Sequence, residues 1–304
     1  MVKNIFTYLS IILLVSCSNQ VSTTSINEND SLCVADTIVT LGDDKQDFSI
    51  EFKTYQKQTL LKADYERKNI YHENSITLQW PVKAQGFNLD SLQHALSELM
   101  SEGNIEDPQV FVDEWAKGMW AEHGWGWNYE IVDSREEEAN NDENDDDDEN
   151  DDDDDIVQYD TDASLELTCI DSDSINHLIT FMKSYSYNNG CGLGSCIYFG
   201  FDHLVYDYVN CKKVELSDII ANEKEAINQL KKQCINSDQY SGLEGLKELT
   251  ELPTNFRISD NVIFFQFEKY EISYGADGCP ELGFDVSKCP NLLTDYGKQV
   301  FRIK

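Results

Sequence analysis

The chain has 304 residues, of which 40% are hydrophobic and 11% aromatic, enough to bury a sizeable core. Its formal net charge is −34, and residues 136–155 contribute 15 acidic side chains and no basic one. Without that run the chain still carries a charge of −19. Because both parts are acidic, the sequence argues against nucleic acid and anionic membrane surfaces as partners and favours a cationic protein or peptide.

The N-terminus has the pattern of a lipoprotein signal. Lys3 precedes an apolar run at 5–15, which is followed by Ser16 and Cys17. As a helix this run would span only about 16 Å at ~1.5 Å per residue, against about 30 Å of hydrocarbon in a bilayer. A small residue before a cysteine is what a lipoprotein signal peptidase needs. We therefore expect a signal peptide at 1–16 and lipid attachment at Cys17. An ordinary secretory signal with an incidental cysteine is the alternative.

Residues 17–46 are expected to form the lipid anchor and a flexible tether, because the stretch is polar and has no apolar period. The folded domain would then occupy 47–304. Acyl chains on Cys17 would attach the protein to the membrane, since no second apolar run approaches the ~18 residues of a membrane span. The residues directly after Cys17 are uncharged, which favours a cell-envelope protein that faces the periplasm.

Eight further cysteines point to disulfide bonds, because their number is even and an exported protein reaches an oxidising compartment. They are Cys33, Cys169, Cys191, Cys196, Cys211, Cys234, Cys279 and Cys289. Cys191 and Cys196 are the easiest pair to join, because the glycines between them let the loop fold back. Cys279 and Cys289 come next. A zinc site is the rival interpretation, but paired C-x-x-C spacings are absent, so no metal ligand is assigned.

The first half of the domain predicts strands followed by helices. Alternating apolar residues predict strands at 48–52 and 76–80, and Pro81 would end the second. Helical spacing predicts helices at 90–100 and from Pro108 to about 124. Further strands are predicted at 125–131 and around 165–167. The acidic run between them, at about 133–156, is expected to be a disordered loop because its carboxylates repel each other. It lacks the glycine that an EF-hand-type calcium loop needs.

The second half of the domain also predicts both helices and strands. Helices are predicted at 174–183, 216–234 and 243–249, and strands at 197–202, 256–258, 262–267 and 270–274. In the last strand, Tyr270 and Tyr274 would share a buried face, with Glu271 exposed on the other. These elements predict an α+β fold, in which helices pack on one face of an antiparallel sheet.

Three stretches occur in an order that resembles the extracytoplasmic domain of the RsiV- and PdaC-like families. They are YFGFD at 198–202, LSDII at 216–220 and FQFEKYEISYGADG at 265–278. The resemblance covers roughly residues 71–301. It implies an α+β domain of exported bacterial proteins, usually without known activity, and one branch of the family senses lysozyme by binding it. The motif residues carried over are Phe201, Asp202, Asp218, Phe267, Tyr270, Glu271, Tyr274 and Gly278.

The chain also departs from those families. Where members often have a Gly-Gly-Ala-His turn, residues 189–192 read Asn-Gly-Cys-Gly, so the histidine is missing. Only four residues precede the N-terminal apolar run, which argues against direct control of a sigma factor. The separate metal-dependent domain of the deacetylase members has no counterpart here.

The sequence assigns no catalytic residue and no cofactor. The five histidines are scattered, and Ser195 lacks the following glycine of a nucleophile elbow. A tryptophan group, Trp115, Trp120, Trp125 and Trp127, could stack on sugars, but its spacing is more typical of a core. We therefore expect a lipid-anchored envelope protein with a non-catalytic ligand- or protein-binding domain. Its partner would be a cationic protein such as lysozyme, or a cell-wall glycan. An envelope hydrolase or deacetylase-associated enzyme acting on cell-wall glycan is the alternative.

Overall fold

The computed structural model describes residues 36–41, 48–65, 68–100, 103–122, 129–133, 161–173, 176–188, 197–235, 243–273 and 278–303. The expected signal peptide, the lipid-acceptor Cys17, nearly all of the acidic run, and Cys33, Cys191 and Cys196 lie outside these ranges. Among the described residues, no helix has the length and apolar character needed to cross a membrane.

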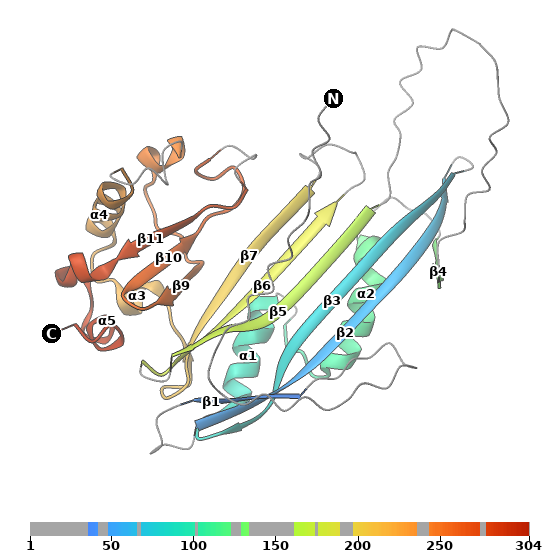
Figure 1. The fold of residues 1–304 in the computed structure, drawn as a ribbon, viewed down its shortest axis with the longest axis horizontal. Coiled ribbons are helices and arrows are strands. Elements are labelled where there is room, and N and C mark those ends of the chain that lie inside the picture. Colours follow the sequence, from blue (N-terminus) through green and yellow to red (C-terminus); the bar gives the residue numbers. More distant parts are fainter. Residues whose placement is uncertain are drawn as a thin grey trace, which may run out of the picture.

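A long twisted sheet of eight strands dominates the described part of the chain (Figure 1). Its strands are β1 (Asp36–Leu41), β2 (Phe48–Tyr65), β3 (Lys68–Gln85), β4 (Tyr129–Val132), β5 (Thr161–Asp173), β6 (Leu178–Asn188), β7 (Ile197–Asp207) and β8 (Lys212–Lys213). Their order is β1-β2-β3-β5-β6-β7-β8, and β4 pairs with β2 as well. Strand β1 lies inside the stretch expected to be a tether, so the sheet already includes residues 36–41.

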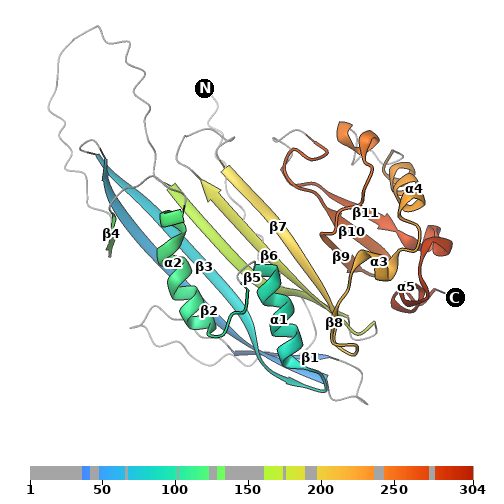
Figure 2. The same ribbon diagram turned by 180° about the vertical axis from the view of Figure 1, so that it is seen from behind.

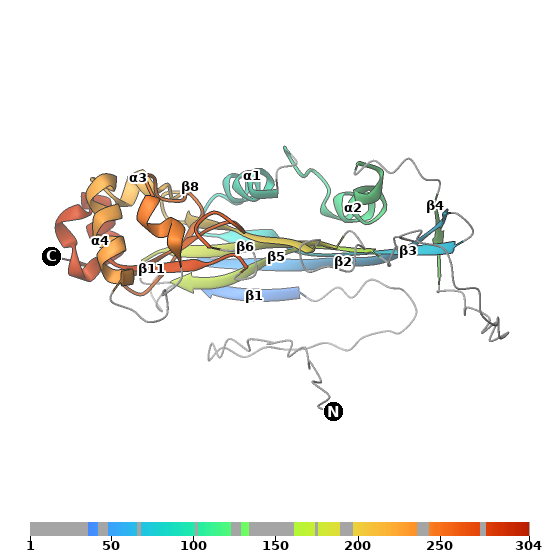
Figure 3. The same cartoon turned by 90° about the horizontal axis from the view of Figure 1, so that it is seen from above.

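Two helices follow β3 and cover one face of this sheet (Figures 2 and 3). They are α1 (Leu89–Met100) and α2 (Pro108–Glu122). Because the chain crosses over through these helices before it returns to the sheet, β3 and β5 pair in parallel, whereas the other ladders of the sheet are antiparallel. The expected α+β class, with helices on one face of a mainly antiparallel sheet, is confirmed.

The main core lies between these helices and the sheet. Alternate residues of β3, among them Ile76, Leu78 and Trp80, point to the helices and are almost completely buried. Helix α1 meets them with its apolar stripe. Farther across the sheet, the Phe181 ring on β6 packs edge-on against Phe52 on β2, with ring centroids 5.9 Å apart. The strands predicted at 48–52 and 76–80 and the two helices are therefore confirmed as parts of one core.

A smaller sheet with short helices follows β8. Its strands are β9 (Phe256–Ser259), β10 (Val262–Gln266) and β11 (Glu281–Asp285), and its helices are α3 (Leu216–Ile219), α4 (Glu223–Ile235) and α5 (Asp295–Val300). The 3-10 turns η3 (Glu244–Glu248), η5 (Val286–Lys288) and η6 (Pro290–Leu292) complete it. It has a core of its own, which Leu178 and Val205 of the large sheet join. The two sheets are thus packed together through the start of β6 and the end of β7.

One predicted helix is wrong. Residues 174–183 contain a turn, in which His177 adopts a φ of 61°, and the first half of β6. Four consecutive residues from Leu178 are buried. Leu178 packs into the core of the small sheet, while Ile179 packs below the helices. A strand buried on both faces loses its alternation, and periodicity alone cannot distinguish it from a buried helix.

Strand β3 continues through Pro81, although the sequence predicts that it ends there. The pairing of β2 with β3 shifts at this point: Phe52 pairs with Pro81, whereas Glu51 pairs with Lys83. The extra residue, Val82, is accommodated by a bulge. Bulges are among the few places where a sheet tolerates proline, because one ladder donor fewer is needed there.

We predict that Phe181→Ala lowers the free energy of unfolding by about 3–5 kcal/mol, because it leaves a cavity opposite Phe52 in the main core. Urea denaturation followed by circular dichroism would measure the loss. Val209→Ala, at an exposed turn position, is the control and should change stability by less than about 0.5 kcal/mol. Equal effects of the two substitutions would contradict this account of the core.

We also predict a loss of stability at alkaline pH. Burial raises the pKa of Tyr208 to about 12. An unfolded tyrosine titrates near pH 10, so between about pH 10 and 12 the unfolded chain releases a proton that the folded chain retains. Stability must therefore fall as the pH rises through this window. The urea midpoint measured from pH 9 to 11.5 would show the decline, and it should be shallower in Tyr208→Phe; an equally steep decline would refute the assignment.

Candidate functional site

Three tyrosines lie side by side on the helix-covered face of the large sheet, beyond the end of α1. Tyr185 and Tyr187 are alternate residues of β6, and Tyr187 pairs directly with Tyr198 on β7. In this register they share the face of Phe181, whose ring is in the core below the helices. Tyr198 is 53% exposed and Tyr185 is 37% exposed. We call Tyr185, Tyr187 and Tyr198 the tyrosine platform.

The side chain of Lys183 marks where the helical cover ends. Its Nζ donates a hydrogen bond to the carbonyl of Leu99, in the last turn of α1, at 3.1 Å. The same Nζ forms an ion pair with Asp202 across the strands at 2.9 Å and lies 5.5 Å from the ring centre of Tyr185. Figure 2 shows the ends of β6 and β7 extending beyond α1. The platform therefore begins at Tyr185, the next residue of β6 on this face after the ion pair between Lys183 and Asp202.

Gly200 gives the Tyr185 ring its position. These two residues pair across β6 and β7, and a Cβ at residue 200 would lie 2.3 Å from the hydroxyl oxygen of Tyr185 and 2.4 Å from its Cζ. Atoms that close cannot coexist, so only glycine lets the phenol lie flat across β7. A larger side chain at residue 200 would therefore move the Tyr185 ring away from β7.

Side chains from the part of the chain that contains the small sheet form hydrogen bonds with the backbone groups along the edge of β7. The amide of Asn255 accepts from the backbone N–H of His203 at 3.0 Å and donates to the carbonyl of Phe201 at 2.5 Å, as a neighbouring strand would. The carbonyl of Phe199 accepts from Cys279 Sγ at 3.2 Å, and that of Ile197 accepts from Lys269 Nζ at 3.0 Å. Unlike an exposed strand edge, this edge is protected from pairing with another chain.

The segment after β10 is a turn and not the strand predicted at 270–274. Its carboxylate at Glu271 accepts from the backbone N–H of Glu268, and Tyr270 has a φ of 73°. Tyr270 is 60% exposed, so the expectation of a buried tyrosine is wrong, whereas Glu271 is exposed as expected. Tyr274 lies outside the described residues. The local hydrogen bond competes with strand formation and reverses the chain beside β7.

Most of the motif residues gather beside β7. Phe201 and Asp202 on β7 and the turn with Tyr270 lie at one end of β7, next to the platform. Gly278 belongs there too, since its φ of 77° favours glycine and a Cβ would approach the Phe199 ring to 3.2 Å. Phe267 is buried in the core of the small sheet.

Asp218 lies elsewhere and serves the fold. Its carboxylate accepts from the backbone N–H of Glu215 at 3.0 Å in a capping box at the start of α3, and it pairs with Lys212 at 2.8 Å. Lys212 also lies 4.8 Å from the ring centre of Tyr296, whose hydroxyl donates to the buried Asp207 at 2.7 Å. This network joins the end of β7 to α3 and α5, and burial is the main cause that raises the pKa of Tyr296.

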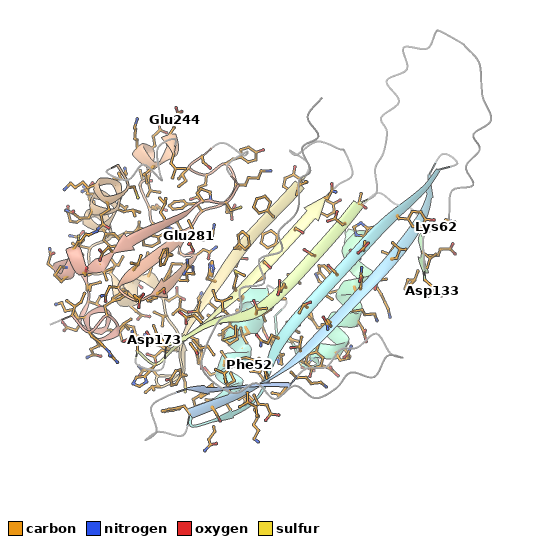
Figure 4. The ribbon with its side chains drawn as sticks, viewed as in Figure 1. Phe52, Lys62, Asp133, Asp173, Glu244 and Glu281 are labelled. Atoms are coloured by element: carbon orange, nitrogen blue, oxygen red, sulfur yellow. The ribbon has the colours of Figure 1, made fainter. Side chains whose placement is uncertain are left out.

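The electrostatic surroundings of the platform are mildly acidic. Burial raises the pKa of Tyr185, and the carboxylates of Asp202 and Glu268 raise it further. Glu281, labelled in Figure 4 on the side of the small sheet that faces β7, is held by a two-pronged ion pair with Arg257 at 2.6–2.7 Å. Asp202 and Glu281 are thus each held by a basic side chain.

No disulfide bond joins the five described cysteines to one another. Cys279 and Cys289, a pair suggested by the sequence, lie on opposite sides of β11: Cys279 bonds to the edge of β7, whereas Cys289 is buried near Gln233 of α4. Strand β11 lies between them in the chain, and both thiols are free. The pair Cys191–Cys196 lies outside the described residues.

The described residues contain no group of three or more His, Cys, Asp or Glu side chains that could hold a metal ion. Of the tryptophans considered for sugar binding, Trp115 packs against the main core from α2, and the side chains of the other three are outside the described part. Sequence reasoning missed the tyrosine platform. Its signal is the pair of alternate tyrosines before residues 189–196 and the tyrosine just after them, once both flanks are recognised as strands.

We predict that Gly200→Ala displaces the Tyr185 ring and lowers the free energy of unfolding by about 0.5–1.5 kcal/mol, because the added Cβ overlaps the phenol and forces this partly exposed side chain away from its rotamer. Adding Tyr185→Ala should restore most of that loss, since it removes the atoms that clash. Urea denaturation of the two single variants and the double variant would give the coupling between the sites. Purely additive losses would show that the clash does not occur.

No protein-family model matches the chain, and no curated protein is similar to it in sequence. Two solved structures are similar in fold. A member of the DUF3298 family from Bacteroides fragilis has a TM-score of 0.56 at 17% identity, covering 82% of this chain and 96% of that one. A DUF3298 family protein from Pseudomonas aeruginosa has a TM-score of 0.48 at 11% identity, covering 81% and 95%. The chain therefore shares the fold of the Bacteroides protein over most of its length.

Proposed function

We propose that the protein is a lipid-anchored component of the cell envelope whose folded domain binds a ligand or another protein without catalysing a reaction. The N-terminal pattern that ends at Cys17 supports the anchor and the export. The fold neighbours are uncharacterised proteins and indicate no catalytic activity.

The gathering of exposed apolar side chains at one end of β6 and β7 carries this proposal. Of the nine large hydrophobic residues exposed in the described part, Tyr185 and Tyr198 lie on the helix-covered face at the ends of these strands, and Tyr270 follows in the adjoining turn. Ile197 is exposed on the opposite face of β7. The other five are dispersed over β1, β3, α2, β4 and the turn after β7. Tyrosine is among the residues that contribute most to binding, so these exposed rings are the strongest candidates for contact with a partner.

The charge of the chain suggests which partners it admits. A net charge of −34 repels anionic partners and attracts cationic ones, so a basic protein such as lysozyme is one candidate and a cell-wall glycan is the other.

Binding of the protein to immobilised lysozyme and to peptidoglycan fragments, measured at moderate salt, tests the proposal. We expect saturable binding to at least one of them, and Tyr198→Ala with Tyr270→Ala should weaken it about tenfold or more, as loss of exposed aromatic anchors does. Ile131→Ala, an exposed residue on β4, is the matched control and should bind like the unaltered protein. Absence of binding to both, or binding that ignores the tyrosines, would overturn the proposal.

A further inference from the structure

We propose that the tyrosine platform is a binding site for a neutral glycan strand, on which pyranose rings stack. The inference rests on the proposed binding function and names the class of ligand. Tyrosine suits such a ligand because its flat ring offers an apolar face to the C–H face of a sugar, while its hydroxyl can bond to the sugar hydroxyls.

The sheet fixes the three rings as one surface. Tyr187 and Tyr198 are directly opposite each other on paired strands, which places their Cβ atoms about 4.5–5.5 Å apart. Tyr185 follows one step along β6 and lies flat over Gly200. Because a regular ladder holds all three backbones, the rings need little ordering when a ligand binds.

The charges argue for a neutral ligand. Lys183 and Asp202, the charged pair next to the platform, neutralise each other at 2.9 Å, and Lys183 is further held by Leu99. Neither of these two charges is left to recognise an ionic group, and the carboxylate of Glu268, which also acts on Tyr185, repels anions. The chain as a whole, at −34, repels anionic polymers. An uncharged polysaccharide needs no charged partner at the platform, and the negative charge of the chain does not repel it.

The size of the platform argues against a protein as its main ligand. An aromatic side chain can bury about 150–250 Å², so the exposed fractions of Tyr185 and Tyr198 offer roughly 200 Å² together. A stable protein interface needs about 800 Å² from each partner. A protein would have to extend far beyond these rings, whereas a few sugar units would cover them.

The test uses the full-length protein and chitohexaose, a neutral N-acetylglucosamine hexasaccharide, in isothermal titration. We expect saturable binding that Tyr198→Ala weakens about tenfold or more, while Tyr198→Phe, which keeps the ring, stays within about threefold. Ile131→Ala is the matched control for an exposed side chain away from the platform and should not change the affinity. Urea midpoints equal to that of the unaltered protein would show that each variant is folded.

Each other outcome is informative. Binding of chitohexaose that Tyr198→Ala leaves unchanged would overturn the platform as the site. Equal binding of a sulfated, anionic hexasaccharide would overturn the neutral class. Tyrosine-dependent binding to lysozyme without any binding to chitohexaose would overturn the glycan inference and leave the proposed function intact. Absence of both would overturn the two together.

Discussion

The open edge of β7 is the constraint on which the arrangement depends. Backbone groups of five alternate residues from Ile197 to Val205 are bonded by parts of the chain outside the main ladder, among them Asn255, Lys269 and Cys279. A strand edge left without partners would expose these groups to pairing with other chains. Satisfying them attaches the small sheet to the large one. The same bonds bring the turn that carries Tyr270 beside the tyrosine platform.

A second constraint is steric. Where the cover of α1 ends, the sheet has to present its face to solvent, and the residues there are tyrosines on a flat backbone. Gly200 leaves room for one of those rings to lie across the neighbouring strand. The glycine and the tyrosine therefore act as a pair. In the sequence, the YFGFD stretch stands out only through a family resemblance. The structure adds that its Gly200 lies against the Tyr185 ring.

Among the described residues, two side-chain amides bond to strand edges in the same way. Asn255 bonds to β7, and Gln233 of α4 bonds to both the N–H and the carbonyl of Asp285, at the end of β11. An amide offers one donor and one acceptor in the spacing of a peptide unit, so it can replace a strand where none follows. Asn255 also accepts, through its backbone carbonyl, from the N–H of Gln266, so it links β7 to β10.

The sequence by itself determined the α+β class, the two helices after β3, and the strands of alternating pattern, because their periods reflect which face is buried. The same periodicity misassigned 174–183, since Leu178 and Ile179 are buried by different layers on opposite faces. Only the tertiary structure decided that Tyr185, Tyr187 and Tyr198 form one surface, that Asp218 caps a helix, and that Cys279 and Cys289 lie apart. Each of these depends on strand register and on distances between segments remote in the chain, which no local pattern encodes.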